Sequence, residues 1–378
     1  EEPFNAKGMS FLEKEKFNEA LKIFNFVITK FPKSKIGYYN LGILHGRQGK
    51  TNEALKYFEK AIEIDPNFAD ANLSKSNCLL RVGKFRDGWK YYKWRKGGRF
   101  LKDKFSLKYS GTRLTSLGNI KNKTILIIYE QGLGDSIQFS RYTKLLLEKK
   151  VKVIFLVQKS LEKILSSLDK NIKIITHLKN YNYDFICPLI DLPRLFGTKV
   201  NTIPDLGTYI FANNNLVLKW KKKLIYNKFN IGIAWQGNGE KKSFKLNLFK
   251  DISKLNNIDL ISLQKNYGTE QLNEFKNKYS IKDFSNTLDL NNDFVDTAAL
   301  IKSMDLVITP CTAVAHLAGA LGTRVWLLLQ YVPDWRWLEK GKKTNWYRSM
   351  KIYRQSKLND WEGIFKQVFI DLKTIVKK

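Results

Sequence analysis

The turn between Thr309 and His316 carries the residues best suited to hold an anion. It follows a short apolar stretch, Asp305–Thr309, and opens a run of small residues that ends at Gly322, so we predict a strand, a turn and a helix. Small side chains let a ligand approach the backbone, and the first N–H groups of a helix attract negative charge. The turn therefore suits a diphosphate, although many strand-to-helix turns of this kind bind nothing.

A second candidate group is the carboxylate of Asp135. It follows two glycines, Gly132 and Gly134, directly after a predicted strand and at the start of a predicted helix. At that edge of a sheet a carboxylate can act as a general base toward a ligand in a cleft. It can equally serve as an N-terminal cap of its helix, which alone would explain an aspartate there.

Three further loops follow predicted strands and carry amide or cationic side chains. One contains Trp235–Gly239 and leads to several lysines, among them Lys242; the others hold Gln264 with Lys265, and Arg336. The carboxyl ends of parallel strands meet at one sheet edge, so these groups converge on that edge. Amides and cations suit phosphate oxygens. In so lysine-rich a chain, however, some of these lysines are expected to be incidental.

The composition limits the classes of function. The chain has 378 residues, of which 43% are hydrophobic and 13% aromatic, so we expect two or three folded domains. The net charge of +31 raises the possibility of nucleic-acid binding. The lysines are scattered, however, and dense runs such as Lys219–Lys223 fall at predicted element ends. A solvated basic surface that favours anionic substrates is therefore preferred, with no specific nucleic acid as partner.

Cysteine and histidine usage bears on the compartment and on metals. Cys78, Cys187 and Cys311 are odd in number and far apart, which favours a reducing cytosol. Only three histidines occur, so we expect no metal site. No apolar run approaches the roughly 20 residues that span a bilayer, and the first residues lack a secretory pattern. We expect a cytoplasmic protein without a transmembrane segment.

A repeat with a period of 34 occupies the first hundred residues. Its small residues let paired helices approach, its aromatic residues fill the space around them, and its proline ends the second helix. The match to a tetratricopeptide repeat is specific in Lys35–Phe68, and a decayed third copy runs from about 69 to 96. Such a stack either binds a protein or peptide or braces its neighbour. The equivalent positions are Phe4 and Tyr38, Gly8 and Gly42, Phe11 and His45, Ala20 and Ala54, Phe24 and Phe58, and Pro32 and Pro66.

Strands and helices alternate in the rest of the chain, which predicts an α/β fold with a doubly wound parallel sheet in each of two tandem halves. A cleft between such halves is the default ligand site. We expect a repeat domain at 1–100, a linker at 101–122, and Rossmann-like domains at 123–226 and 227–378, the latter with the final helix. The expected helices are 136–149, 160–168, 248–255, 269–278, 294–303 and 359–376, and the expected strands are 124–129, 151–157, 172–176, 183–186, 230–235, 258–263, 305–309 and 325–329.

From about Lys123 onward the chain resembles glycosyltransferases of the GT-B fold that occur with tetratricopeptide repeats in bacteria. It is similar to the heptosyltransferase-like family 9 enzymes and, more remotely, to O-linked N-acetylglucosamine transferases. This resemblance implies an acceptor domain at 123–226 and a nucleotide-sugar donor domain at 227–378. The segments that carry it are Glu130–Tyr142, Ile231–Asn238, Ser262–Lys265, Asp296–Leu300, Asp305–Leu329, Pro333–Trp337 and Trp346–Gln355.

The resemblance also implies roles for single residues. Asp135 matches the family's catalytic base, and we expect a metal-independent, inverting transfer without a cofactor. The expected ligands of the donor diphosphate are Thr312, Ala313, Val314, Ala315, His316, Lys242, Lys265 and Arg336. The expected contacts of the donor base or sugar are Trp235, Gln236, Asn238 and Gln264, and those of the acceptor are Gln131, Gly132, Gly134 and Gln138.

Several functions remain open on the sequence alone. The leading hypothesis is transfer to a hydroxyl of a protein that the repeats present, and an alternative is transfer to a lipopolysaccharide-type glycan. A third hypothesis is a scaffold without catalytic activity. Two departures from the family pattern motivate it: Pro310-Cys311 replaces a pair that usually ends in Asp, and the segment 240–244 is lysine-rich rather than arginine-rich.

Overall fold

We describe the protein from a computed structural model that defines residues 1–96, 112–178, 181–237, 239–291 and 293–376. The chain divides into two compact units. The repeat unit comprises residues 1–110, 197–202 and 332–340, and the α/β unit comprises residues 111–196, 203–331 and 341–378. Half of the predicted linker, residues 101–111, lies outside the described residues, and the predicted domain boundaries stay a prediction.

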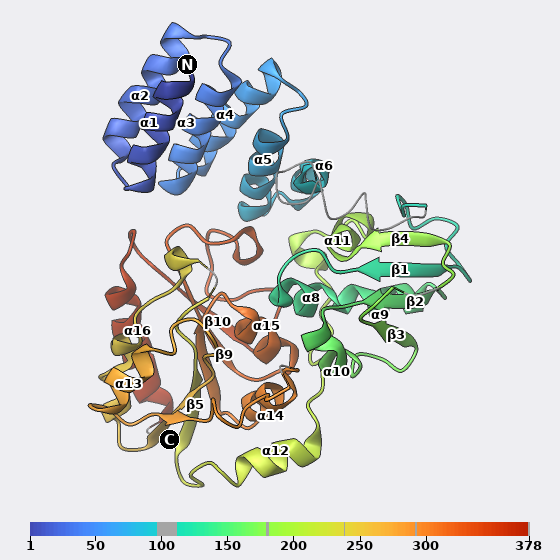
Figure 1. Ribbon diagram of the computed structural model, residues 1–378, viewed down its shortest axis with the longest axis vertical. Coiled ribbons are helices and arrows are strands. Elements are labelled where there is room, and N and C mark those ends of the chain that lie inside the picture. Colours follow the sequence, from blue (N-terminus) through green and yellow to red (C-terminus); the bar gives the residue numbers. More distant parts are fainter. Residues whose placement is uncertain (97–111, 179–180, 238, 292, 377–378) are drawn as a thin grey trace. The chain divides into compact units, whose positions relative to one another are not determined.

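The repeat unit is built from helix pairs that follow the period of 34 (Figure 1). A Cβ at Gly8 would lie 2.3 Å from the Phe24 ring, and one at Gly42 would lie 2.4 Å from the Phe58 ring. The small residue at this position is therefore needed because a phenylalanine of the partner helix packs directly on it. The helices are α1 (Glu2–Glu13), α2 (Phe17–Lys30), α3 (Lys35–Arg47), α4 (Thr51–Ile64), α5 (Ala69–Arg81) and α6 (Phe85–Tyr92).

Two short segments from later in the chain complete the repeat unit. The Trp335 ring packs edge-on against Phe85, Trp89 and Tyr92, with centroids 5.4 to 6.0 Å apart. The Trp89 indole donates a hydrogen bond to the carbonyl of Thr198, at 2.7 Å. The aromatic residues of the decayed third repeat therefore form a core with partners from outside the repeat sequence.

We expect Trp335→Ala to destabilise the repeat unit by about 3–5 kcal/mol, because it leaves a cavity among three aromatic rings. Hydrogen exchange followed by mass spectrometry would show faster exchange in peptides from α5 and α6. The control is Phe26→Ala in the same unit, since Phe26 is 47% exposed. Equal exchange in the Trp335→Ala and wild-type proteins would contradict this assignment.

The first sheet of the α/β unit is parallel, with strand order β3-β2-β1-β4. Its strands are short and apolar, and side chains are buried on both faces, as expected for a parallel sheet covered by helices. The elements are β1 (Thr124–Ile128), α8 (Leu133–Phe139), α9 (Arg141–Glu148), β2 (Lys152–Leu156), α10 (Glu162–Leu165), β3 (Ile172–Ile175), β4 (Phe185–Pro188) and α11 (Leu192–Leu195).

The predicted helix at 136–149 starts earlier and is divided at Ser140. The Ser140 hydroxyl donates to the carbonyl of Ile137, and the Thr143 hydroxyl donates to the carbonyl of Ser140. Such bonds from a side chain to the preceding turn compete with the regular helical ladder and bend helices. Because the helix begins at Leu133, Gly134 and Asp135 lie within its first turn.

The second sheet is also parallel, with strand order β10-β9-β8-β5-β6-β7. The predicted doubly wound α/β fold is thus confirmed, although β7 and β10 were not predicted. The elements are α12 (Asn214–Lys221), β5 (Phe229–Ile233), β6 (Ile258–Ser262), α13 (Gln271–Lys276), β7 (Lys282–Asp283), α14 (Val295–Lys302), β8 (Leu306–Pro310), α15 (Ala313–Ala320), β9 (Val325–Leu329), β10 (Met350–Arg354) and α16 (Trp361–Val376).

The predicted helix at 248–255 is wrong. Two 3-10 turns occupy this segment, Leu246–Phe249 and Ile252–Lys254. Leu246, Phe249 and Ile252 are all buried. Their spacing of three residues matches a 3-10 turn, in which side chains three apart lie on one face. An apolar spacing of three is close enough to the α-helical period to mislead over one short segment.

Candidate active site

The candidate site lies where four segments follow strands of the α/β unit. α8 follows β1, the loop 235–242 follows β5, the loop 264–268 follows β6, and α15 follows β8. In parallel α/β sheets, ligands bind outside the carboxyl ends of the strands. The order of elements therefore places the predicted groups at the edge where such sites occur.

The anion cradle is predicted at the N-terminus of α15. Thr312 is the N-cap residue in an extended conformation, and within the described structure its side chain does not cap the helix. Its hydroxyl instead lies 3.1 Å from that of the buried Thr309. Thr312, Ala313 and Val314 are partly exposed, whereas Ala315 and His316 are buried. The accessible part of the predicted cradle is thus its first three residues.

A lysine lies beside this helix end. A Cβ at Gly237 would lie 2.9 Å from Cγ2 of Thr312 and 3.3 Å from Cε of Lys242. Gly237 therefore lets the two approach closely, and the Ser243 hydroxyl fixes the loop by donating to the carbonyl of Gly239 at 2.9 Å. The described residues offer the Lys242 ammonium no ion pair. Helix end and cation together favour a negatively charged group between them.

The predicted donor residues after β5 and β6 hold these two loops together. The Gln264 side-chain oxygen accepts hydrogen bonds from the backbone N–H groups of Trp235 and Gln236, both at 3.0 Å. Its amide group donates to the carbonyls of Gln236 and Tyr267. The buried Trp235 indole donates to the carbonyl of Gly268. These groups therefore shape the loops, and their contact with a base or sugar stays a prediction.

Two other predicted donor residues have partners of their own, and a third is not described. The Lys265 ammonium donates to the carbonyl of Asp289, at 3.1 Å. Arg336 belongs to the repeat unit, where its guanidinium pairs with Asp334 at 2.9 Å and lies over the Trp335 ring. Asn238 lies outside the described residues. The structure thus brings Lys242 together with α15, and the roles of the other three stay predictions.

Asp135 caps the helix on which it lies. Its carboxylate accepts a hydrogen bond from the backbone N–H of Gly132, at 3.0 Å. The side chain is partly exposed, so the carboxylate is also accessible to a ligand. Capping and proton transfer are compatible, because a carboxylate has acceptor sites for more than one hydrogen bond.

Gly134 brings α8 into contact with α15. A Cβ at Gly134 would lie 2.7 Å from Cδ2 of His316 and 3.6 Å from Cα of Ala313. Asp135 is the next residue, so the carboxylate and the anion cradle lie on two helices that touch (Figure 1). Of the other predicted acceptor residues, Gln131 and Gly132 are exposed, whereas Gln138 is fully buried and cannot reach a ligand at this surface.

We expect Gly134→Val to separate α8 from α15 and to loosen the first turn of α15. The added side chain collides with a buried ring, an overpacking that costs about 1–3 kcal/mol. The measurement is hydrogen exchange in peptides of α15. The control is Gly118→Ala, because a Cβ there would lie 3.7 Å from its nearest neighbour. Unchanged exchange in Gly134→Val would show that the contact is not needed.

Sequence reasoning missed a buried network behind the cradle. Nδ1 of His316 lies 3.0 Å from the hydroxyl of Tyr347. Burial raises the pKa of Tyr347 well above its usual range, so its hydroxyl stays protonated. The ring of Tyr347 in turn lies under the guanidinium of Arg141, at 4.8 Å. His316 is therefore held from behind while its other edge faces Gly134.

Arg141 is the centre of this network. The side chain is 1% exposed and bonds only to neutral groups among those described, namely the carbonyls of Gln138, Pro204 and Trp346 and the hydroxyl of Tyr209. The Gln138 carbonyl lies in α8. The oxygens of Pro204 and Tyr209 lie in the connection between the sheets, and that of Trp346 lies in the segment before β10. One guanidinium thus joins both halves of the α/β unit behind the site. In the sequence, this network is marked only by an arginine beside Tyr142. That pattern is too common to predict a buried network.

The described residues contain no cluster of three or more His, Cys, Asp or Glu side chains that could hold a metal ion. In the same part of the chain, no helix is both long enough and apolar enough to cross a membrane. Neither finding changes the geometry of the site.

Both parts of this architecture, the helical repeats and the two parallel sheets, occur in known proteins. Residues 36–68 match the tetratricopeptide repeat family, which confirms the repeat predicted at Lys35–Phe68. The solved glycosyl transferase family 9 structure from Veillonella parvula covers 71% of this chain and 99% of its own, at 10% identity and a TM-score of 0.52. This likeness confirms the predicted GT-B-type fold, and it concerns the fold alone.

Two further proteins are similar to this chain. Protein FlbA of Caulobacter vibrioides is 22% identical over 395 residues, which cover 94% of this chain and 63% of FlbA. This chain thus spans less than two thirds of the curated relative's length. The ADP-heptose lps heptosyltransferase II of E. coli covers 67% of this chain and 98% of its own, at 11% identity and a TM-score of 0.49.

Proposed function

We propose that the protein is a glycosyltransferase that moves a sugar from a nucleotide-sugar donor to an acceptor hydroxyl. The observation that carries this proposal is the placement of Lys242 beside the uncapped N-terminus of α15, on which α8, the helix of Asp135, also packs. A cation and a helix end on one side and a carboxylate on the other are the groups that an inverting transfer requires.

Each group has a defined task in this reaction. The donor diphosphate lies at the backbone N–H groups of Thr312, Ala313 and Val314, with Lys242 beside it. As the bond between the anomeric carbon and the diphosphate oxygen breaks, negative charge grows on the leaving group, and these groups stabilise it. Asp135 accepts the proton of the acceptor hydroxyl. The oxygen of that hydroxyl attacks the anomeric carbon from the face opposite the diphosphate. The products are the glycosylated acceptor and a nucleoside diphosphate.

This chemistry does not call on a metal ion, because Lys242 and the helix end supply the positive charge that a metal supplies elsewhere. His316 is buried behind the cradle, so its proposed task is to orient the first turn of α15 through Tyr347. In this proposal, Trp235 and Gln264 act indirectly by fixing the loop that carries Lys242.

The experiment that tests the proposal is calorimetry of the full chain against UDP-, GDP-, ADP- and CMP-sugars. We expect one nucleotide class to bind. Lys242→Ala should weaken that binding by roughly 10-fold to 100-fold, the worth of one hydrogen bond to a charged group. Lys245→Ala removes the same charge from an exposed position three residues further along the chain and is the matched control.

The outcomes separate the enzyme from the scaffold. Binding of no member of the panel would contradict the proposal and favour a scaffold that has lost its donor. Equal losses in Lys242→Ala and Lys245→Ala would show that general surface charge, and not the cradle, attracts the nucleotide.

The proposed acceptor is a hydroxyl on a protein that the repeat unit presents, in the cytoplasm. The support for this step is the tetratricopeptide repeat at 36–68, since such stacks commonly bind peptides. Incubating the full chain with a radiolabelled donor and a cell extract distinguishes the acceptors. Label in protease-sensitive material supports a protein, whereas label in a protease-resistant glycan supports the alternative acceptor.

A further inference from the structure

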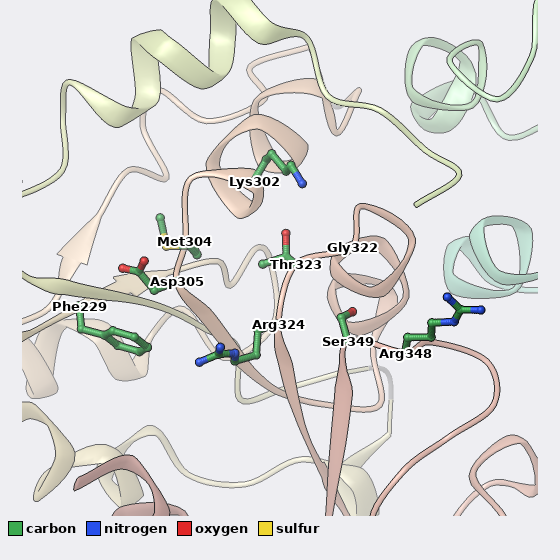
Figure 2. A pocket seen from close by; sticks show the side chains of 9 residues that line it. All are labelled: Phe229, Lys302, Met304, Asp305, Gly322, Thr323, Arg324, Arg348 and Ser349. Atoms are coloured by element: carbon green, nitrogen blue, oxygen red, sulfur yellow. The ribbon is translucent and has the colours of Figure 1, made fainter. Parts of the chain in front are cut away.

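A cavity lies at the opposite edge of the second sheet from the candidate active site. It is bounded by the N-terminal ends of β5, β8, β9 and β10 and by the end of α14, and its volume is about 680 Å³ (Figure 2). The anion cradle lies beyond the carboxyl ends of β5 and β8. The cavity and the cradle are therefore separate sites on one sheet. This volume lies within the range of roughly 300–1,000 Å³ that small-molecule sites occupy.

The groups that line the cavity are mainly hydrogen-bond donors. The exposed Arg324 guanidinium has neither an ion pair nor a hydrogen-bond partner among the described residues. The Lys302 ammonium donates to the carbonyl of Leu321 at 3.1 Å, which leaves other N–H groups available. The Ser349 hydroxyl is buried, and no described group bonds to it. One acidic side chain, Asp305, lines the cavity, and it accepts a hydrogen bond from the backbone N–H of Asn230.

We propose that this cavity binds a small phosphate-bearing ligand. The planar guanidinium of Arg324 can bind two phosphate oxygens at once, and the ammonium of Lys302 adds a point charge. A buried hydroxyl without a partner is costly unless a ligand or water completes it, and a phosphate oxygen can accept its hydrogen bond. Phe229 forms part of one wall, so an organic group attached to the phosphate can pack there.

The rim of the cavity is joined to the connection between the two sheets. Gly322, which lines the cavity, has φ of +72°, and a Cβ there would lie 2.3 Å from the Thr208 hydroxyl. The next residue along the connection, Tyr209, donates its backbone N–H to the carbonyl of Ala320. Arg348 also lines the cavity and forms an ion pair with Asp205. Figure 2 shows Arg348 turned away from Arg324, in keeping with this pairing.

A phosphate in the cavity therefore competes with Asp205 for Arg348. Binding would release Asp205 and loosen the hold of the connection on α15, the helix whose other end forms the cradle. Because coupling between two sites is reciprocal, weakening the ion pair should strengthen binding in the cavity. We expect Asp205→Asn to tighten phosphate binding roughly twofold to fivefold, since this substitution frees Arg348 for the ligand.

The test is calorimetry of the full chain with inorganic pyrophosphate. The Lys242→Ala variant weakens the cradle, and binding that persists in it is assigned to the cavity. We expect Arg324→Ala to weaken this remaining binding by about tenfold or more, and Ser349→Ala to weaken it severalfold. Arg324 and Lys366 are both exposed, so Lys366→Ala on α16 removes the same charge without touching the cavity.

Two outcomes would overturn the proposal. If Lys242→Ala loses all pyrophosphate binding and Arg324→Ala loses none of it, the ligand lies in the cradle. Equal losses in Arg324→Ala and Lys366→Ala would show only diffuse attraction to a basic surface. The proposal does not depend on glycosyl transfer, because pyrophosphate can bind the cavity of a chain that binds no nucleotide sugar. Repeating the titration with inorganic phosphate and with a sugar phosphate then distinguishes a free ion from an organic phosphate.

Discussion

Asp135→Asn is expected to lower the rate of glycosyl transfer by about 10²-fold to 10⁴-fold, the usual contribution of a positioned general base. The amide group cannot accept the proton of the acceptor hydroxyl. Its oxygen can still accept the hydrogen bond from Gly132, so α8 keeps its cap. Donor affinity should stay within about threefold of the wild-type value, because the donor cradle lies on α15. Turnover and donor binding are measured separately, by product formation under saturating donor and by calorimetry.

The comparison with Asp135→Ala separates catalysis from capping. The alanine variant loses both the base and the cap, and loss of a helix cap costs about 1 kcal/mol of stability. We expect the two variants to be equally inactive, and the alanine variant alone to melt at a lower temperature. An Asp135→Asn protein that is folded and turns over at the wild-type rate would remove Asp135 from the mechanism.

Arg141→Leu is expected to destabilise the α/β unit by about 3–5 kcal/mol. The substitution leaves two buried carbonyls, one partly buried carbonyl and the Tyr209 hydroxyl without their donor, and each fully buried group costs about 1–3 kcal/mol. Removing a buried charge recovers part of this cost, so the sum over the four groups is an upper bound. Hydrogen exchange in peptides from 133–148 and 313–320 reports the loss in the segments concerned.

Two variants control for the loss of charge and for the loss of bonds. Arg324→Leu removes a guanidinium that has no hydrogen-bond or ion-pair partner among the described residues, and should change stability by less than about 0.5 kcal/mol. Arg141→Lys keeps the charge, but an ammonium cannot reach all four oxygens, so its effect should fall between the others. Wild-type protection in Arg141→Leu would show that the network is dispensable.

Local patterns sufficed to predict the parts of the fold that rest on short-range periodicity. The period of 34 predicted the helix pairs because Gly8 and Gly42 each meet a ring of the partner helix. The apolar strands and small-residue helix at 305–329 predicted β8, α15 and β9. The segment 248–255 failed because a spacing of three, with Phe249 and Ile252 buried, is hard to tell from a helical period over one or two turns.

The candidate site was predictable in position and less so in the task of each residue. Strand order brings α8, α15 and Lys242 to one edge, and that follows from the alternation of elements. Which polar groups remain available to a ligand depends on long-range partners. From the sequence, Gln264 and Arg336 are predicted to contact the donor, yet their side chains bond within the protein. Arg141 is the opposite case, since no sequence pattern predicts its role in the buried network. Its partners at 204, 209 and 346 are scattered along the chain.

The interleaving of the two units has a consequence for the evolution and engineering of this protein. Residues 197–202 and 332–340 belong to the repeat unit, although the sequence on either side of each belongs to the α/β unit. Within the repeat unit, Trp335 completes the aromatic core. Cutting the chain once after the repeats would leave Phe85 and Trp89 without part of their packing. We therefore expect the two units to be inherited together. A chimera with a foreign repeat array should also need matching replacements for residues 197–202 and 332–340.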